Sequence, residues 1–427
     1  MARGAEIDEV LRRFDDFQRC HNHPQRLTRE LPVQGVEIAN VDTAQMRHAG
    51  KGPLSLALMD ARNHSLRWAA AFEASPAGAA PLLWELGRLG WFQEHWIARN
   101  VQRQRGERCD AMRPKLASIW PEADALFELP RAAPLIDLQT IRQYLFETLE
   151  STLELLEGTT GDDEALYFYR LALLREDACV ERFAVLSQSL GFDTGLRAPL
   201  VTRPVRPPLL FPATLIQLGS APGGFVPDRE KWAHEVALPE FEIDSQAVTW
   251  AQYGEFVEDG GYDDRRHWAE AGWAWVQGDG QGQGRRTPRF VEQMRQGVLQ
   301  QRFGKLVRVP PAQPAMHVSW YEADAWCRWA GRRLPGEAEW EAAALQGATR
   351  GFRWGDVREW TAGTLRPYPA APAASAPGQS EHAGAAPRRV LRGASFATRG
   401  RLRHEKARGA EASGFDEGFC GFRSCAV

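Results

Sequence analysis

Two stretches of the chain carry side chains of the types that bind transition metals. His95 lies in one stretch, and Glu176, Asp177 and Cys179 lie within about one helical turn of each other in the second. Imidazole nitrogen, thiolate sulfur and carboxylate oxygen are all ligands for first-row metals in proteins. Together they suggest one candidate metal site, built from two separate segments.

The same side chains also have a purely structural interpretation. Glu176 and Asp177 stand beside Arg175 and close to Arg182, and they can form ion pairs with these neighbours. His95 stands among tryptophan and phenylalanine residues and can pack with them as a half-buried aromatic ring. The sequence alone leaves both interpretations open.

The composition favours a protein that handles small molecules, with neither nucleic acid nor membrane as a partner. The chain has 427 residues, enough for two domains, and a net charge of -3 at pH 7, which provides no basic surface for nucleic acid or anionic lipid. Its six cysteines are scattered without a CxxC pair, as is typical of reduced thiols. No apolar run is long enough to cross a membrane and no signal-peptide core is found, so we expect a cytoplasmic protein.

The first half of the chain is predicted to be helical. Apolar residues recur at helical spacing in the stretches 7–17, 54–72, 81–101, 137–156 and 164–190. The four longer helices are expected to form a bundle whose core can host a metal or ligand. The proline-rich stretch 197–208 is the expected crossing between domains, which we place at 1–205 and 206–427.

Beyond the crossing, the pattern changes to that of an irregular α+β domain. Short apolar runs at 213–218 and 241–249 alternate with glycine and proline, and helices are predicted at 250–258 and 321–330. The stretch 364–388 is dominated by alanine, proline and glycine and is predicted to be an exposed loop with little fixed structure.

A series of motifs in the second half connects the chain to a known family. The motifs are HVSWYEADAWCRWAGRRLPGEAEW at 317–340, WGD at 354–356, EWT at 359–361, LRGASF at 391–396 and GFR at 421–423. In order and residue type they resemble the formylglycine-generating-enzyme-like domain, a sulfatase-modifying-factor domain with a C-type-lectin-like fold. We interpret the tryptophans at 320, 326, 329 and 340 as core.

The first half narrows the resemblance. LWELGRLGWFQEHWIARN at 83–100 and FYRLALLREDACVE at 168–181 look like the two metal helices of the DinB-like four-helix bundle that ergothioneine-forming sulfoxide synthases fuse to this domain. Several details are most similar to selenoneine synthases. The implied fold class is therefore multidomain: an α bundle followed by an α+β domain.

The resemblance implies an Fe(2+) cofactor, but the ligand residues differ in this chain. The family holds iron with one histidine on the first helix and a His-x-x-x-His pair on the second, and the matching positions here are Arg88, Arg175 and Cys179. A guanidinium group has no lone pair for a metal. We therefore predict that the family metal triad is lost, with His95 as an alternative ligand.

The resemblance also assigns residues to chemistry and to the substrate pocket. Tyr368 stands where a family tyrosine could deliver a proton to a reduced oxygen species, although a loop tyrosine packed by its prolines is the alternative. Gln93 and Phe415 are assigned to the pocket, and a solvated helix face is the alternative for Gln93.

Two further pocket positions depart from the family pattern. Arg358 stands where the family has tryptophan, and the stretch 408–414, which begins with Arg408, lacks the arginine-asparagine-aromatic motif that lines the hercynine pocket. Aromatic faces bind trimethylammonium groups, so their loss weakens the expected contact with hercynine.

Two functions from different classes follow. One is a selenoneine-synthase-like enzyme that uses iron and oxygen to join selenium from a selenosugar, or sulfur from a thiol, to the imidazole of hercynine. The other is a metal-free binding or regulatory protein on the same scaffold, in which Arg88 and Arg175 attract an anion. A copper formylglycine-generating oxidase is disfavoured because the segment 398–404 contains no cysteine.

Overall fold

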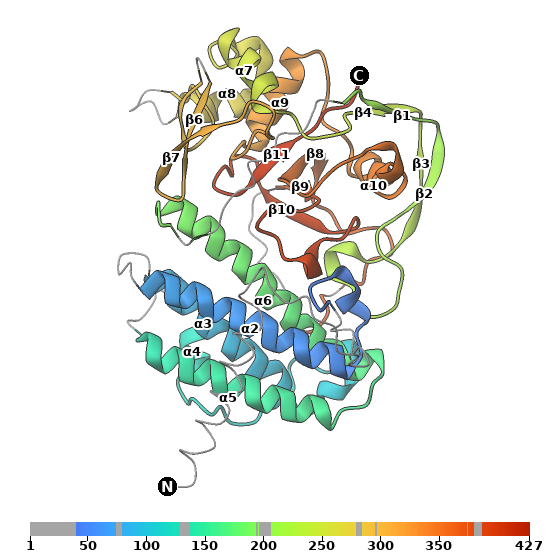
Figure 1. Cartoon of the computed structure of the whole chain (residues 1–427). Helices are drawn as coiled ribbons and strands as arrows, with labels where there is room; N and C mark the ends of the chain where they lie inside the picture. The colour runs from blue at the N-terminus through green and yellow to red at the C-terminus, as the bar shows by residue number, and fades with distance from the viewer. Residues whose placement is uncertain are drawn as a thin grey trace, which may run out of the picture. The chain divides into compact units, whose positions relative to one another are not determined.

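The apolar periodicity of the first half produces four long helices that pack on one another (Figure 1). The computed structural model describes residues 40–73, 79–128, 136–193, 195, 206–278, 284–294, 297–373, 375–379 and 387–427. The predicted helix 7–17 and most of the predicted crossing 197–208 lie outside the described residues. The domain boundary at 205/206 therefore stays a prediction.

Apart from the C-terminal end of α3, the long helices of the first half begin and end close to the predicted residues. They are α2 (Lys51–Glu73), α3 (Ala79–Gln93), α5 (Leu138–Glu157) and α6 (Asp163–Ser189), with the short α4 (Ala123–Phe127) between them. Aspartates cap two of them: the carboxylate of Asp137 accepts from the Thr140 amide at the start of α5, and that of Asp162 accepts from the Ala165 amide at the start of α6.

The predicted helix 81–101 is interrupted. α3 ends at Gln93, and a π-helical turn, Glu94–Ala98, continues the chain. The buried carboxylate of Glu94 accepts hydrogen bonds from the Ile119 amide, the Ser118 hydroxyl and the Tyr144 hydroxyl. These partners come from a following loop and from α5, so the local sequence pattern does not indicate the interruption.

The second half is the predicted irregular α+β domain. Its central sheet has the order β10-β9-β8-β11, in which β11 pairs with β8 in parallel and the other pairs are antiparallel. The strands are β8 (Arg358–Thr364), β9 (Arg388–Arg392), β10 (Arg408–Ala412) and β11 (Cys420–Phe422). The helices of this half are α7 (Trp250–Glu258), α8 (Glu270–Gln277), α9 (Trp320–Trp329) and α10 (Glu337–Gln346). Capping boxes at Thr249 and Ser319 begin α7 and α9, close to the predicted starts.

Smaller sheets surround this centre. β1 (Leu209–Phe211) pairs with β4 (Phe241–Ile243), and β2 (Thr214–Leu218) pairs with β3 (His234–Leu238). A meander is formed by β5 (Val291–Gln293), β6 (Val298–Arg302) and β7 (Lys305–Val309). The apolar run at 213–218 is thus a strand, whereas the run at 241–249 forms only β4 before Thr249 caps the next helix.

Burial agrees with the tryptophan prediction and corrects the loop prediction. Trp320, Trp326 and Trp340 are buried, and Trp329 is half-buried against the core. In the loop after β8, Pro377 accepts a hydrogen bond from the Tyr167 hydroxyl through its carbonyl oxygen. The expectation of little fixed structure is therefore wrong near Pro377, whereas Arg366, Pro367, Pro369 and Ala370 are exposed, as predicted.

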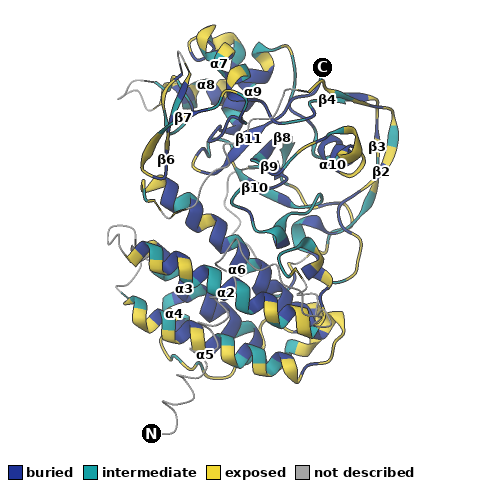
Figure 2. Cartoon of the chain, viewed as in Figure 1, coloured by how far each residue is buried: buried dark blue, intermediate teal, exposed yellow. Residues whose placement is uncertain are grey.

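Helix α6 contacts both halves of the chain. Residues Asn40–Val427 form one compact unit, which includes both α6 and the second half of the chain. At the C-terminal end of α6, the side-chain amide of Gln188 donates to the Gln301 carbonyl and accepts from the Phe303 amide of the β6–β7 hairpin. Figure 2 shows that α6 is largely buried, whereas α5 exposes much of one side. No helix within the described residues is long and apolar enough to span a membrane.

Candidate functional site

The three positions that match the family's iron ligands lie together between α3 and α6. The Arg175 guanidinium of α6 lies over the Phe92 ring of α3, 4.4 Å from its centroid. One turn along α6, the Cys179 thiol contacts the Glu85 carboxylate at 3.6 Å. The Arg182 guanidinium forms an ion pair with that carboxylate at 2.9 Å. We call Glu85, Arg88, Arg175, Cys179 and Arg182 the guanidinium cluster.

These contacts also place Arg88. Residue numbers rise along α6 from Arg175 to Arg182 as they fall along α3 from Phe92 to Glu85, so this pair of helices is antiparallel. Arg88 lies about one helical turn from both Glu85 and Phe92, on the same face of α3. It therefore faces the part of α6 between Arg175 and Arg182. Its guanidinium lies 5.1 Å from the centroid of the Trp84 ring.

The guanidinium cluster carries net positive charge. It contains three guanidinium groups and one carboxylate. Burial lowers the pKa of Arg175 to about 10, and the charges of Arg88 and Arg182 lower it further in the same direction. Burial likewise lowers the pKa of Arg88. Burial raises the pKa of the Cys179 thiol to about 12, so this side chain is neutral at physiological pH.

The residues of the guanidinium cluster do not fit a bound iron ion. Two of the three positions offer guanidinium groups without a lone pair, and the third offers a protonated thiol. Elsewhere in the described part of the chain, no group of three or more histidine, cysteine, aspartate or glutamate side chains is arranged to hold a metal.

His95 lies apart from the cluster, in the π-helical turn. Its ring contacts Trp91 and Trp96, with centroids 4.9 Å and 5.1 Å away. Burial, with the nearby charges of Lys115 and Arg99, lowers its pKa to about 4. The structure does not bring this imidazole into one group with the α6 carboxylates.

The predicted local ion pairs of Glu176 and Asp177 are wrong. The Glu176 carboxylate accepts from the Arg62 guanidinium of α2 at 2.9 Å. The Asp177 carboxylate accepts from the Arg401 guanidinium of the second half at 2.6 Å and 2.8 Å. All four side chains are buried. Because the partners are far away in sequence, neither Arg62 nor Arg401 carried a recognisable signal.

Arg358, assigned to the substrate pocket, joins the two halves. Its guanidinium donates to both oxygens of the Glu181 carboxylate on α6, at 2.8 Å and 2.5 Å. The Ser395 hydroxyl donates to the same carboxylate at 2.8 Å. An arginine at this position thus uses a carboxylate of the bundle as its partner.

Gln93, also assigned to the pocket, is buried at the end of α3. Its side-chain oxygen accepts from the Arg62 guanidinium at 2.9 Å, so it belongs to the same group as Glu176. Its side-chain nitrogen has no partner among the described residues.

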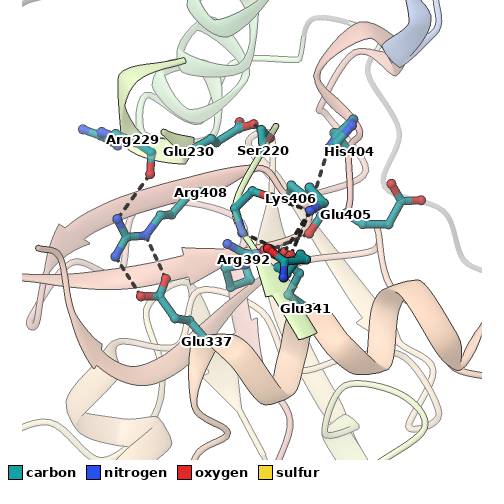
Figure 3. Close-up of polar contacts among 12 residues, drawn as sticks. Ser220, Arg229, Glu230, Glu337, Glu341, Arg392, His404, Glu405, Lys406 and Arg408 are labelled. Carbon is teal, nitrogen blue, oxygen red and sulfur yellow. Dashed lines mark hydrogen bonds and ion pairs between the residues drawn. The ribbon is translucent and has the colours of Figure 1, made fainter. Parts of the chain in front are cut away.

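Tyr368 and Arg408 lie together in the second half. The Arg408 guanidinium lies 4.2 Å from the centroid of the Tyr368 ring. Figure 3 shows Arg408 pointing toward the Glu337 carboxylate and the Arg229 carbonyl, which accept its hydrogen bonds at 2.7 Å and 3.2 Å. Burial raises the pKa of Tyr368, and its hydroxyl has no partner within the described residues. Its role as a proton donor stays a prediction.

A second buried polar group surrounds Tyr368. Glu341, fully buried, accepts from Arg392 and lies 3.6 Å from the Lys406 ammonium (Figure 3). Phe415 is half-buried and packs against the core of the domain. None of the described contacts joins Tyr368, Arg408 or Phe415 to the guanidinium cluster.

Comparison with known proteins covers both halves. The family description "Sulfatase-modifying factor enzyme 1-like domain" matches residues 211–356. A hercynine oxygenase of Mycolicibacterium smegmatis is 30% identical over an alignment of 351 positions that covers 68% of this chain and 77% of that protein. A hercynine oxygenase of Mycolicibacterium thermoresistibile is 29% identical over an alignment of 353 positions that covers 75% of this chain and 74% of that protein. A formylglycine-generating enzyme of Streptomyces coelicolor is 35% identical over an alignment of 168 positions that covers 36% of this chain and 52% of that enzyme.

The similarity to the hercynine oxygenases extends over most of each chain, and the sulfatase-modifying-factor match falls in the half where the motifs predicted it. This chain therefore belongs to the hercynine oxygenase family, the ergothioneine- and selenoneine-type sulfoxide synthases that carry a formylglycine-generating-enzyme-like domain.

Proposed function

We propose that this chain is a metal-free member of its family that acts as a small-molecule binding or regulatory protein. It keeps the scaffold and lacks the Fe(2+) site on which oxygen-dependent carbon–selenium or carbon–sulfur bond formation depends in the family. The observation that carries the proposal is the guanidinium cluster. A cation would meet three guanidinium groups beside a single carboxylate, Glu85, and a neutral thiol at Cys179.

The environment of α6 supports the same proposal. The carboxylates nearest to the guanidinium cluster on this helix are already in ion pairs, Glu176 with Arg62 and Asp177 with Arg401. They would have to leave these partners, at high cost in a buried setting, before they could replace the missing ligands.

The test is the iron content of the purified protein after anaerobic incubation with ferrous iron. The unmodified protein is expected to hold none, and a triple variant with Arg88→His, Arg175→His and Cys179→His is expected to hold about one iron per chain, since it regains the family's three nitrogen ligands. A Cys109→His variant, which adds a histidine in the bundle away from the cluster, controls for adventitious binding. Stoichiometric iron in the unmodified protein would overturn the proposal.

A second candidate is the selenoneine-synthase-like enzyme, which joins selenium from a selenosugar, or sulfur from a thiol, to hercynine. The identity with hercynine oxygenases across both halves favours it. Its test is product formation from hercynine, oxygen and either donor with ferrous iron present. Turnover by the unmodified protein would support this candidate. An unchanged rate in the Tyr368→Phe variant would then show that Tyr368 is not the proton donor.

A further inference from the structure

We propose that Arg88, Arg175 and Arg182 form a binding site for the phosphate group of a small molecule, held between α3 and α6 where relatives hold iron. The inference rests on the proposed function, because an iron ion and a phosphate group cannot share this position.

Charge balance is the first support. Of the three guanidinium groups in the cluster, Arg182 is neutralised by Glu85 at 2.9 Å. Within the described part of the chain, neither Arg88 nor Arg175 has a hydrogen-bond or ion-pair partner, and each contacts an aromatic ring instead. Glu85, the one carboxylate of the cluster, is already engaged by Arg182, so Arg88 and Arg175 still repel each other, and a dianion between them removes that repulsion.

The orientation of the guanidinium groups is the second support. The Trp84 and Phe92 rings lie beside the carbon centres of Arg88 and Arg175, at 5.1 Å and 4.4 Å from the centroids. A guanidinium group whose carbon lies over a ring can still donate hydrogen bonds through its outer N–H groups, and their spacing matches that of phosphate oxygens. The Nε atom of Arg88 is buried and has no partner among the described residues, so phosphate oxygens would be bound by the terminal nitrogens of the guanidinium groups.

Access to the cluster is the third support. Arg88 and Arg175 are half-buried, and 54% of the Arg182 side chain is exposed. Beneath them, Cys179 is fully buried and uncharged, so it does not repel an anion. Glu85 is the one acidic member of the cluster, and it is therefore the residue that limits the affinity for a dianion.

The test is calorimetric titration of the full chain with inorganic phosphate, with glycerol phosphate as a monoester and acetate as a monoanion. The double variant Arg88→Gln, Arg175→Gln should weaken phosphate binding at least about tenfold, as expected for lost hydrogen bonds to charged groups. Arg108→Gln, on an exposed arginine of the same half, should leave binding unchanged. Acetate should bind more weakly than phosphate, because one negative charge balances only half of the excess.

Weaker binding by a variant can also result from misfolding, so a second variant is chosen that should bind phosphate more tightly. Glu85→Gln removes the competing carboxylate and should tighten phosphate binding several-fold. If glycerol phosphate binds more tightly than inorganic phosphate, the ligand is a phosphate monoester. If inorganic phosphate binds more tightly, the ligand is the free ion. Either result supports the proposed site. Equal binding by the double variant means an adventitious ion only, and no binding by the unmodified protein likewise overturns the inference. Iron in the unmodified protein would instead overturn the proposed function.

Discussion

The two sides of helix α6 differ in how their charges are satisfied. At 100° per residue, Asp177, Glu181 and Gln188 share the side that faces the second half of the chain, and Arg175, Cys179 and Arg182 share the side that faces α3. On the first side the carboxylates of Asp177 and Glu181 are paired with Arg401 and Arg358. On the α3 side, positive charge exceeds negative charge.

This difference separates a structural role from a binding role within one helix. Buried charges in monomeric proteins are normally paired, since an unpaired one costs several kcal/mol. The paired side obeys this rule and holds the two halves together. The α3 side departs from it, at the positions where the family's ligands would stand, and a departure of this kind is typical of a site that is completed by a ligand.

The largest predicted effect lies on the paired side. Arg401→Met leaves the carboxylate of Asp177 buried without its main partner, and we expect it to lower the free energy of unfolding by about 3–5 kcal/mol. Urea denaturation measures this change. Arg266→Met, which removes an arginine whose side chain is 86% exposed, should change stability by less than about 0.5 kcal/mol. Equal effects of the two variants would refute the role of the Arg401 pair.

The second effect is a pH dependence at Glu181. Burial alone would raise the pKa of this carboxyl, but Arg358 and Ser395 hold it below its ordinary value of 4.5. Because the pKa is lower in the folded state, the pair stabilises fully above pH 4.5 and its contribution is lost as the pH falls through the folded value.

Glu181→Gln should therefore cost about 1–3 kcal/mol at pH 7, and much less once the pH falls well below 4.5. Stability curves of both proteins across this pH range measure the difference. Glu411→Gln, at a more exposed ion pair with Arg388, serves as the control. If the difference in free energy of unfolding between the unmodified protein and Glu181→Gln stayed constant from pH 7 to well below pH 4.5, the stabilising role of the ionised Glu181 would be contradicted.

The smallest effect, of opposite sign, lies on the α3 side. Arg175→Gln relieves repulsion by Arg88 and Arg182, so in phosphate-free buffer at low salt we expect a gain of up to about 1 kcal/mol in the free energy of unfolding. Added sodium chloride should reduce the gain through screening. A loss comparable to that of Arg401→Met would show that Arg175 has a partner and would remove the contrast between the two sides.

The sequence predicted what depends on local pattern. Apolar periodicity and capping residues place α2, α5, α6, α7 and α9 within a few residues of their observed bounds. The helices α8 and α10 were missed, since their apolar residues do not recur at helical spacing over several turns.

What the sequence could not predict depends on distant partners. The π-helical turn at Glu94 has hydrogen-bond partners 24, 25 and 50 residues away. The partners of Glu176 and Asp177 lie 114 and 224 residues away, whereas the prediction assumed neighbours on the same helix. For the site, the motif positions of Arg88, Arg175 and Cys179 were sufficient to predict lost ligands, but not the stacking of the two arginines on Trp84 and Phe92.

The central claim is that the position between α3 and α6 selects an anion where relatives hold a cation. The most direct measurement is a pair of anaerobic calorimetric titrations of one sample at pH 7, with ferrous iron and with inorganic phosphate. We predict saturable binding of phosphate, abolished in the Arg88→His, Arg175→His, Cys179→His variant, and no binding of iron to the unmodified protein. Saturable binding of iron to the unmodified protein, with none of phosphate, would contradict the account.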